Sequence, residues 1–223
     1  MRLSTFILIL LFLAPALASA QTTIGVKAQT GKAWMSVPEG WVRVGFDDRI
    51  PHWGYSIEVF KPLNRHLSLG VAPGYMRRGT AFEIGFINGF GPRFISMLHL
   101  NYVQLPFYLK LEKKLIGRIA GYVQSGVGLS YLVDGYRIVE MYNVSDPPPI
   151  QNRPLDFSDD GDGVHRLDLG WHNSAGFTIR IGPGNLLLSA DYYHGYLQVS
   201  QRRPVKNRNW AMGLGYVYRL GEN

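Results

Sequence analysis

The stretch from residue 101 to residue 112, NYVQLPFYLKLE, alternates between apolar and polar side chains. Its apolar positions are Val103, Leu105, Phe107, Leu109 and Leu111, and its polar positions are Tyr102, Gln104, Tyr108, Lys110 and Glu112. Successive side chains of a strand point to opposite faces, so this pattern predicts a strand with one apolar and one polar face. About ten residues with this period is the length of a strand that crosses a membrane in a β-barrel.

Seven further segments alternate in a similar way, and with residues 101–112 they predict eight strands. These segments are 22–30, 53–61, 65–77, 118–133, 165–181, 186–199 and 209–220. Each places mainly aliphatic and aromatic residues on one face and polar residues or glycines on the other. The repetition matters more than any one segment, because a single soluble strand also alternates.

The connections between these strands alternate in length. Three are short, at 62–64, 113–117 and 182–185, and the others are mostly longer, at 31–52, 78–97, 134–164 and 200–208. Outer-membrane barrels have short periplasmic turns and longer outside loops, and lipid requires the sheet to close. We therefore predict an all-β fold, an eight-stranded antiparallel transmembrane β-barrel of the outer membrane, with both chain ends on the periplasmic side.

The first 20 residues have the pattern of an export signal. Arg2 is followed by a short apolar run at 6–13, and Ala18-Ser19-Ala20 is a small-residue cleavage site. We predict that residues 1–20 are a signal peptide that is removed and that 21–223 form the barrel domain. No other segment approaches the 18 apolar residues of a transmembrane helix. The chain has no cysteine, which excludes disulfides and lipid attachment through an N-terminal cysteine.

The formal net charge of +7 bears on the choice of partners. A basic chain often binds nucleic acid, but export argues against that partner. We predict contacts with outer-membrane lipid and lipopolysaccharide, and with the barrel-assembly machinery during insertion. Aromatic residues near predicted strand ends favour membrane-interface girdles, namely Trp171, Tyr192, Trp210 and Tyr218. A secreted β-sandwich or lipocalin-like barrel, with its apolar face inward, is the soluble alternative.

Three segments resemble the PorT-like outer-membrane β-barrel domain family. They are YMRRGT at 75–80, LNYVQLPFYLKLE at 100–112 and GYVQSGVGLSYL at 121–132, and the resemblance extends over about 24–220. Its most specific piece is Tyr102–Pro106, a tyrosine, two residues, an apolar residue and a proline. The resemblance implies a barrel without a catalytic signature. One branch of the family is implicated in type IX protein secretion and gliding, and nothing in this sequence marks it as that branch.

The last predicted strand resembles the signal that the barrel-assembly machinery reads. Gly215, Tyr218 and Leu220 match the later positions of that signal. Gly213 stands where a polar residue is usual, and residues 221–223 extend past the expected end.

Charged residues recur on the predicted inward faces of the strands. They are Lys27, Glu58, Lys110, Glu112, Arg118, Asp168, Arg180, Asp191 and Arg219. Eight strands leave an interior that side chains just fill, and charges buried there need opposite partners. We therefore predict an ion-pair network that closes the barrel. A gated ion path is the alternative, and it would make the protein a narrow channel or a component of a transport or secretion system.

No catalytic, metal or cofactor site is predicted. His172 and Ser174 share the inward face, and a hydrolase needs such a base beside its nucleophile, so a lipid A-modifying hydrolase is a third reading. Loop 156–163 holds four aspartates and could bind Ca²⁺, but it lacks the full spacing of a calcium loop. A solvated acidic loop is the simpler interpretation.

Segment 78–97 is rich in apolar residues around Asn88-Gly89, a dipeptide that favours a hairpin turn. The apolar residues are Phe82, Ile84, Phe86, Phe90 and Phe94. They indicate either two strands that continue beyond the membrane or an apolar surface that binds a lipid tail or a partner. The sequence as a whole predicts a non-enzymatic outer-membrane barrel with a structural or loop-presenting binding role.

Overall fold

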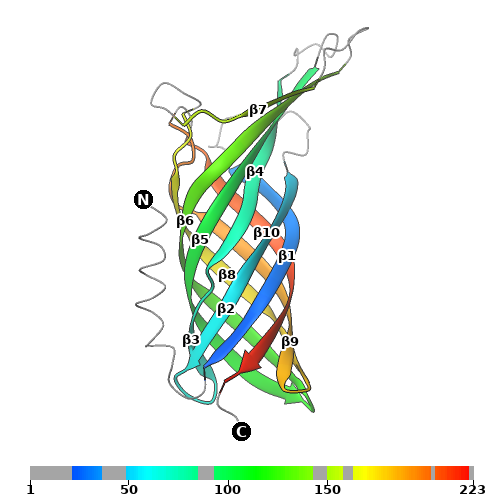
Figure 1. Cartoon of the computed structure of the whole chain (residues 1–223), viewed down its shortest axis with the longest axis vertical. Coiled ribbons are helices and arrows are strands. Elements are labelled where there is room, and N and C mark those ends of the chain that lie inside the picture. The colour runs from blue at the N-terminus through cyan, green and yellow to red at the C-terminus, as the bar shows by residue number, and fades with distance from the viewer. Residues whose placement is uncertain are drawn as a thin grey trace.

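Ten strands form one antiparallel sheet in the computed structural model, which describes residues 22–36, 49–84, 93–142, 150–157, 163–201 and 204–220 (Figure 1). The strands are β1 (Thr23–Ser36), β2 (Ile50–Pro62), β3 (Leu67–Val71), β4 (Gly74–Ile84), β5 (Arg93–Ile116), β6 (Ile119–Tyr142), β7 (Gln151–Pro154), β8 (Leu167–Ile181), β9 (Gly184–Gly195) and β10 (Lys206–Arg219). Within the described residues, no helix has the length and hydropathy needed to cross a bilayer.

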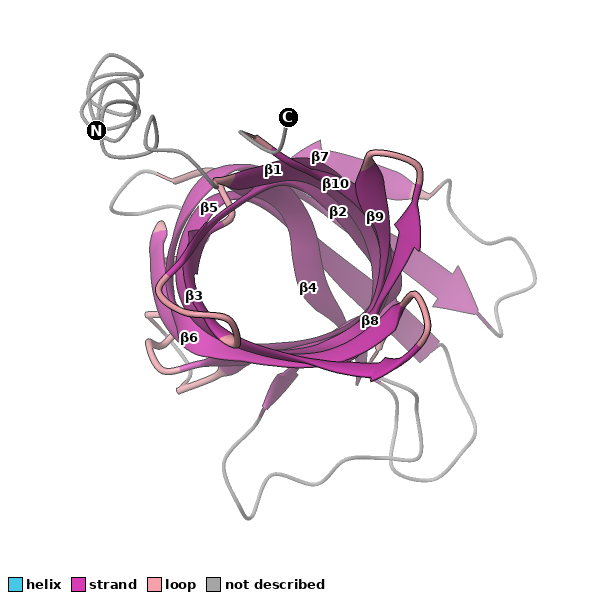
Figure 2. Ribbon diagram, turned by 90° about the horizontal axis from the view of Figure 1, so that it is seen from below, coloured by secondary structure: helices cyan, strands magenta, loops and turns pink. Residues whose placement is uncertain are grey.

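The sheet closes on itself into a ring, as Figure 2 shows in a view from below the barrel. β1 pairs with both β2 and β10, so the first and last strands of the chain lie side by side. β3 and β4 both pair with β2 and β5, and together they fill one position in the ring. The ring therefore has eight strand positions, with β7 attached outside it to β6, and the predicted all-β barrel fold is confirmed.

The strand between β2 and β5 is interrupted, whereas the sequence predicts one continuous strand over 65–77. The break falls at Ala72-Pro73. Proline has no N–H to donate to the sheet, so the regular ladder stops there. The two residues at the break remain hydrogen-bonded to the neighbouring strands. The Ile57 N–H donates to the Pro73 carbonyl at 2.9 Å, and the Ala72 N–H donates to the Pro106 carbonyl at 3.2 Å.

β5 and β6 are longer than the sequence predicts, and β7 is not predicted at all. β5 pairs with β6 as far as Arg93 and Tyr142, while the pairing of β6 with β8 ends at Tyr131 and Leu167. The β5–β6 hairpin therefore continues past the rim of the ring, at the end opposite to the start of β1 and the end of β10 (Figure 1). In barrels of this class the long connections and such extensions face outside the cell.

The outer wall of the barrel is apolar, in the register that the sequence predicts. On β10, the side chains of Trp210, Met212, Leu214 and Tyr216 are exposed, and those between them are buried. On β5, Phe107, Leu109 and Leu111 are exposed while Tyr108 and Lys110 are buried. Exposed apolar rows of this extent suit contact with lipid, since soluble proteins rarely expose patches this large.

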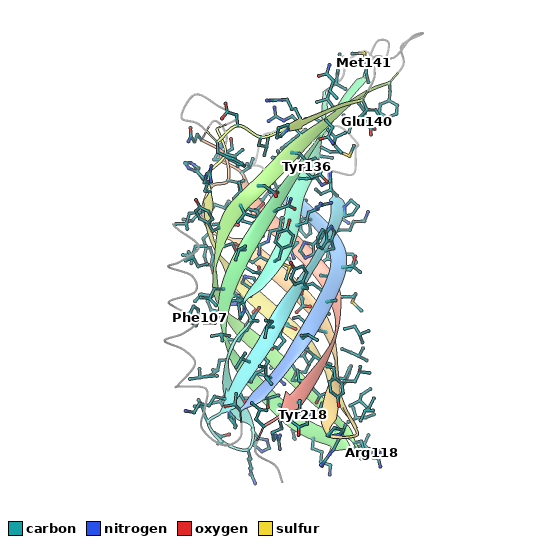
Figure 3. All side chains as sticks on the ribbon, viewed as in Figure 1. Phe107, Arg118, Tyr136, Glu140, Met141 and Tyr218 are labelled. Atoms are coloured by element: carbon teal, nitrogen blue, oxygen red, sulfur yellow. The ribbon has the colours of Figure 1, made fainter. Side chains whose placement is uncertain are left out.

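Phe107 is a direct test of this register, because it lies about midway along the barrel wall (Figure 3) and is 47% exposed. Phe107→Arg is expected to make folding into a bilayer less favourable by about 2–4 kcal/mol, since it places a cation at mid-membrane depth. Leu115→Arg is the control, because Leu115 is 56% exposed near the turn end of β5, where the cost falls to about 0–1 kcal/mol. Equal costs in a liposome-folding titration would contradict the assigned depth.

Candidate functional site

The barrel interior contains a first charge cluster around Lys27 of β1. The Lys27 ammonium lies 3.1 Å from a carboxylate oxygen of Asp191 on β9 and 3.5 Å from one of Glu58 on β2. Each carboxylate also accepts a serine hydroxyl at 2.7 Å, Asp191 from Ser189 and Glu58 from Ser56. Because consecutive inward positions on a strand are two residues apart, each serine lies beside the carboxylate that it supports.

A second cluster surrounds Arg78 of β4, which is 1% exposed. Its guanidinium donates to Gln104 at 2.7 Å, to Ser130 at 3.2 Å and to the Asp168 carboxylate at 3.5 Å. The same guanidinium lies 3.8 Å from the centre of the Tyr193 ring. A cation over an aromatic face gains further electrostatic stabilisation when water is excluded. Arg78 thus joins β4 to β5, β6, β8 and β9 across the interior.

Asn207 of β10 extends this second cluster. Its amide nitrogen donates to Asp168 at 2.8 Å and to the Tyr102 hydroxyl at 3.0 Å. Gly170 leaves room for the Tyr193 ring that packs on Arg78, because a Cβ atom at residue 170 would meet that ring at 2.4 Å. The sequence prediction includes Asp168 but misses Arg78, since it ends the strand at Arg77.

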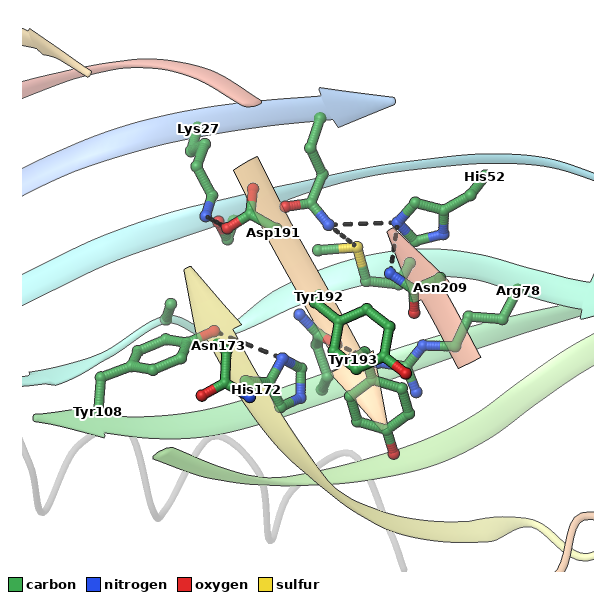
Figure 4. A pocket seen from close by; sticks show the side chains of 15 residues that line it. Lys27, His52, Arg78, Tyr108, His172, Asn173, Asp191, Tyr192, Tyr193 and Asn209 are labelled. Carbon is green, nitrogen blue, oxygen red and sulfur yellow. Dashed lines mark hydrogen bonds and ion pairs between the residues drawn. The ribbon is translucent and has the colours of Figure 1, made fainter. Parts of the chain in front are cut away.

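A small cavity lies between the two clusters (Figure 4). It has a volume of ≈ 20 Å³ and is lined in part by Lys27, His52, Arg78, Tyr108 and His172. That volume accommodates about one water molecule. Side chains therefore fill this part of the interior, as expected for a ring of eight strands.

Lys110 and Glu112 form a third pair nearer the turn end of the barrel. Their charged atoms lie 2.6 Å apart, and the Glu112 side chain is 35% exposed. The Lys110 ammonium also lies 4.7 Å from the centre of the Tyr122 ring and 5.0 Å from that of Phe60. This pair is open to solvent on the carboxylate side, unlike the pairs of Lys27 and Arg78.

For three residues the predicted position in the barrel interior is wrong. Arg118, Arg180 and Arg219 are exposed at the end of the barrel that carries the short turns, and Figure 3 shows Arg118 there. The reason is geometric. Alternation along a strand fixes the face of a residue but not its depth, and at the rim the inward face is open to water.

The opposite end of the barrel is closed by an apolar cluster, which we call the mouth cluster. Its members are Met35, Leu98, Leu100, Tyr102, Leu132, Leu155, Val164, Val199 and Val205. Four of them come from the segments between strands, so these segments pack against the strand residues at this end of the barrel. Backbone hydrogen bonds fix them there, from the Val199 N–H to the Val205 carbonyl and from the Leu155 N–H to the Gly135 carbonyl, at 2.8 and 2.9 Å.

A family model for the outer membrane protein beta-barrel domain matches residues 19–201. The chain belongs to this family. The family and the closed ring together place the protein in the outer membrane. No curated protein matches the chain at a significant level.

Several solved structures share the barrel architecture of this family. The attachment invasion locus protein Ail of Yersinia pestis, crystallised with the heparin analogue sucrose octasulfate, is 14% identical with a TM-score of 0.37, over 90% of this chain and 100% of that one. Neisserial surface protein A is 12% identical with a TM-score of 0.46, over 88% and 97%. An outer membrane channel from Pseudomonas putida F1 is 9% identical with a TM-score of 0.31, over 91% and 96%. Likeness at this level carries no information on function.

In this outer-membrane barrel, the two residues on which the hydrolase alternative rests, His172 and Ser174, have no hydrolytic geometry. His172 and Ser174 both point inward, as predicted, but no hydrogen bond joins them, and His172 Nε2 and Ser174 Oγ are both buried without a hydrogen-bond partner among the described residues. The His172 ring instead faces the Tyr108 hydroxyl, with Nδ1 at 3.5 Å, and packs on Tyr193 with ring centres 4.6 Å apart. Among the described residues, no three His, Asp or Glu side chains are close enough together to hold a metal ion.

The apolar residues predicted in segment 78–97 are only partly described. Phe82 and Phe94 are half-buried, and Phe82 packs against the mouth cluster. Ile84 pairs with Phe94 in the β4–β5 register. Phe86, Phe90 and the Asn88-Gly89 turn lie outside the described residues, as do 1–20 and most of the acidic loop 156–163.

Next to the mouth cluster, and sharing Leu98 and Leu100 with it, four strand segments form what we call the projecting sheet, namely 79–84 of β4, 93–100 of β5, 134–142 of β6 and 151–154 of β7. Its base is held by aromatic and cationic contacts. The Arg77 guanidinium lies 5.0 Å from the Trp53 ring centre and 5.4 Å from that of Tyr136, which in turn stacks on His99 at 4.6 Å. Asn101 accepts a hydrogen bond from Arg77 at 3.2 Å.

Proposed function

We propose that this protein is a non-enzymatic, non-conducting outer-membrane barrel whose projecting sheet binds a partner outside the membrane. The observation that carries the proposal is the continuation of the β5–β6 hairpin beyond the rim of a closed barrel. Residues 132–142 of β6 extend about 35 Å along the strand past the last β8 partner. A rigid extension of that length is not needed to span a bilayer.

The surface of the projecting sheet supports a binding role. Ile95, Met97, Ile138 and Val139 are only half-buried, and Tyr142 is 47% exposed. Partly exposed apolar residues on a well-ordered support are typical of interaction surfaces. The short β7 with Pro154 covers the outer edge of β6, which protects the sheet against unspecific strand pairing.

The interior argues against a channel. Along the barrel, the Lys27 and Arg78 clusters and then the mouth cluster occupy the space between the turn end and the outer rim. Ions would have to displace buried, paired charges and then an apolar layer, both of which oppose conduction. The lipid A-modifying hydrolase is disfavoured because His172 and Ser174 face this closed interior rather than lipid.

The proposal includes the finer features that the sequence predicts. We expect export through removal of residues 1–20, insertion by the barrel-assembly machinery and placement within the PorT-like group. The last of these rests on the motifs at 75–80, 100–112 and 121–132.

Two measurements test the proposal. In planar bilayers, the purified barrel is expected to show no steady ion conductance. In intact cells, a photoreactive residue in place of Met141 is expected to capture the same outside partner in independent preparations, because Met141 lies on the projecting sheet (Figure 3). The same substitution at Ile116, which is 74% exposed at the opposite end, is the control and should not capture that partner. Steady conductance, or identical adducts at both sites, would contradict the proposal.

A further inference from the structure

The outward face of β8, β9, β10 and β1 carries a cluster of cations at the outer edge of the lipid-facing wall. Across these strands, Asn173, Tyr192, Trp210 and Lys32 are register partners in one row, and Trp171, His194, Arg208 and Trp34 in the next row outward. Trp171 and Trp210 are exposed, so both rows face outward. The cations therefore stand within an aromatic belt, the feature that marks the headgroup level of a membrane.

Lys32 and Arg208 lie close enough to contact one anion. They are diagonal neighbours on adjacent strands, because Lys32 pairs with Trp210 and Trp34 pairs with Arg208. Such positions are about 7–8 Å apart at the backbone, which two long side chains can bridge. Lys206 follows on the same face of β10, two residues beyond Arg208.

No described carboxylate neutralises this cluster. Lys32 and Lys206 form no ion pair with a described residue, and the described parts of β1, β8, β9 and β10 carry no outward acidic side chain. Arg208 is oriented by neutral groups, with one guanidinium nitrogen 2.7 Å from His194 Nδ1 and 3.2 Å from the Tyr192 hydroxyl. Its other guanidinium N–H groups donate to no described residue, so they are available to an acceptor.

An apolar groove begins directly below the cations. It has a volume of ≈ 690 Å³, and its lining includes the small residues Ala28, Thr30, Ala175 and Ala190 and the larger Phe177, Leu188, Met212 and Leu214. In the register, Ala175, Ala190, Met212 and Thr30 form the row next to Tyr192, Trp210 and Lys32. Small residues between larger ones create a depression in the wall, and its size is that of a ligand site.

We propose that this face is a specific site for a phosphorylated lipid of the lipid A type in the outer leaflet. An acyl chain lies in the groove, and a phosphate accepts hydrogen bonds from Lys32 and Arg208. The arrangement matches the chemistry of such a lipid in order and polarity, with apolar wall, aromatic belt and cations following one another outward. A wall that only contacts lipid tails has no need of cations beside a groove. Binding of a phosphate does need them, and Lys32 and Arg208 form no ion pair with a described residue.

The site is tested by native mass spectrometry of the whole barrel in detergent, with lipid A and with lipid A whose phosphates have been removed. The wild-type barrel is expected to retain the phosphorylated form more strongly. Lys32→Gln should weaken retention about fivefold and Lys32→Gln with Arg208→Gln roughly 25-fold, since each cation near an anionic membrane surface contributes about 1 kcal/mol. Retention of the dephosphorylated form should not change.

Two further variants separate the site from general lipid contact. Lys113→Gln removes an exposed cation at the opposite end of the barrel and should leave retention unchanged. Ala190→Phe fills the groove from the exposed face and should weaken retention of lipid A while the barrel keeps its thermal midpoint. Equal retention of both lipid A forms by the wild type, no effect of the double substitution, or stronger retention of phosphatidylglycerol would each overturn the proposal.

Discussion

Replacing Arg78 by methionine is expected to lower the free energy of unfolding of the barrel by about 3–5 kcal/mol. Arg78 is fully buried and donates to Gln104, Ser130 and Asp168. Methionine fills a similar volume but leaves the buried Asp168 carboxylate without its cation, and loss of one partner from a buried pair has about this cost. The measurement is urea unfolding of the barrel in lipid vesicles, followed by tryptophan fluorescence.

Two comparisons make this expectation specific. Arg118→Met removes an arginine that is exposed at the turn end, so it should change stability by no more than about 0.5 kcal/mol. Asp168→Asn in the Arg78→Met background removes the unpaired charge while Asn207 keeps an acceptor, and it should recover part of the loss. If Arg118→Met were as harmful as Arg78→Met, or if Asp168→Asn added its own full cost, the buried pair would not be what holds the barrel.

Period-two alternation was sufficient to predict the barrel, because one physical constraint acts on every membrane strand. Residues such as Phe107 and Leu214 must face lipid, and Lys27 and Asp191 must not. The same alternation predicts which charged residues point into the barrel. It placed Lys27, Glu58, Lys110 and Asp168 on the buried face, where the structure also has them.

Alternation gives no information on depth along the barrel axis. Arg118, Arg180 and Arg219 have inward parity but lie where the interior opens to water. Which acid contacts which base also depends on how far neighbouring strands are staggered, and that shear is a property of the closed ring. The contacts of Lys27 with both Glu58 and Asp191 depend on this stagger, so the sequence of a single strand does not determine them.

Arg78 follows the same alternation when the pattern is continued past residue 77. Gly74 has inward parity in the predicted strand, and continuing by twos passes through Met76 to Arg78. The predicted strand ends at Arg77 because the sequence predicts a connection over 78–97. Two arginines in sequence also hide the alternation, since one of them stacks on Trp53 outside while the other is buried inside.

The projecting sheet could not be predicted from its own sequence. Beyond Val133 the β6 segment mixes polar and apolar residues without a clean period, because no lipid imposes one there. A register shift in the β5–β6 pairing between Asn101 and Tyr102 also interrupts the two-residue alternation between inward and outward side chains. Its strands are instead ordered by pairing with each other and by contacts at the base, such as the stack of His99 on Tyr136.

Replacing Lys27 by methionine is expected to cause the second large loss of stability. Lys27→Met leaves the carboxylates of Glu58 and Asp191 facing each other without the cation between them, each still tied to its serine. We expect a loss of about 3–5 kcal/mol in the free energy of unfolding, because the buried Glu58 carboxylate and the largely buried Asp191 carboxylate then lack their cation. Lys110→Met should cost less, since Glu112 is partly exposed and water can replace its cation.

Neutralising the two acids distinguishes charge pairing from simple packing as the role of Lys27. Adding Glu58→Gln and Asp191→Asn to Lys27→Met removes every unpaired charge while Ser56 and Ser189 keep oxygen acceptors. A closed hydrogen-bonded interior of neutral groups should then recover most of the lost stability, as replacement of whole buried ion pairs often does. Failure to recover, with Lys110→Met as harmful as Lys27→Met, would mean that the lysine stem packs the interior and its charge is incidental.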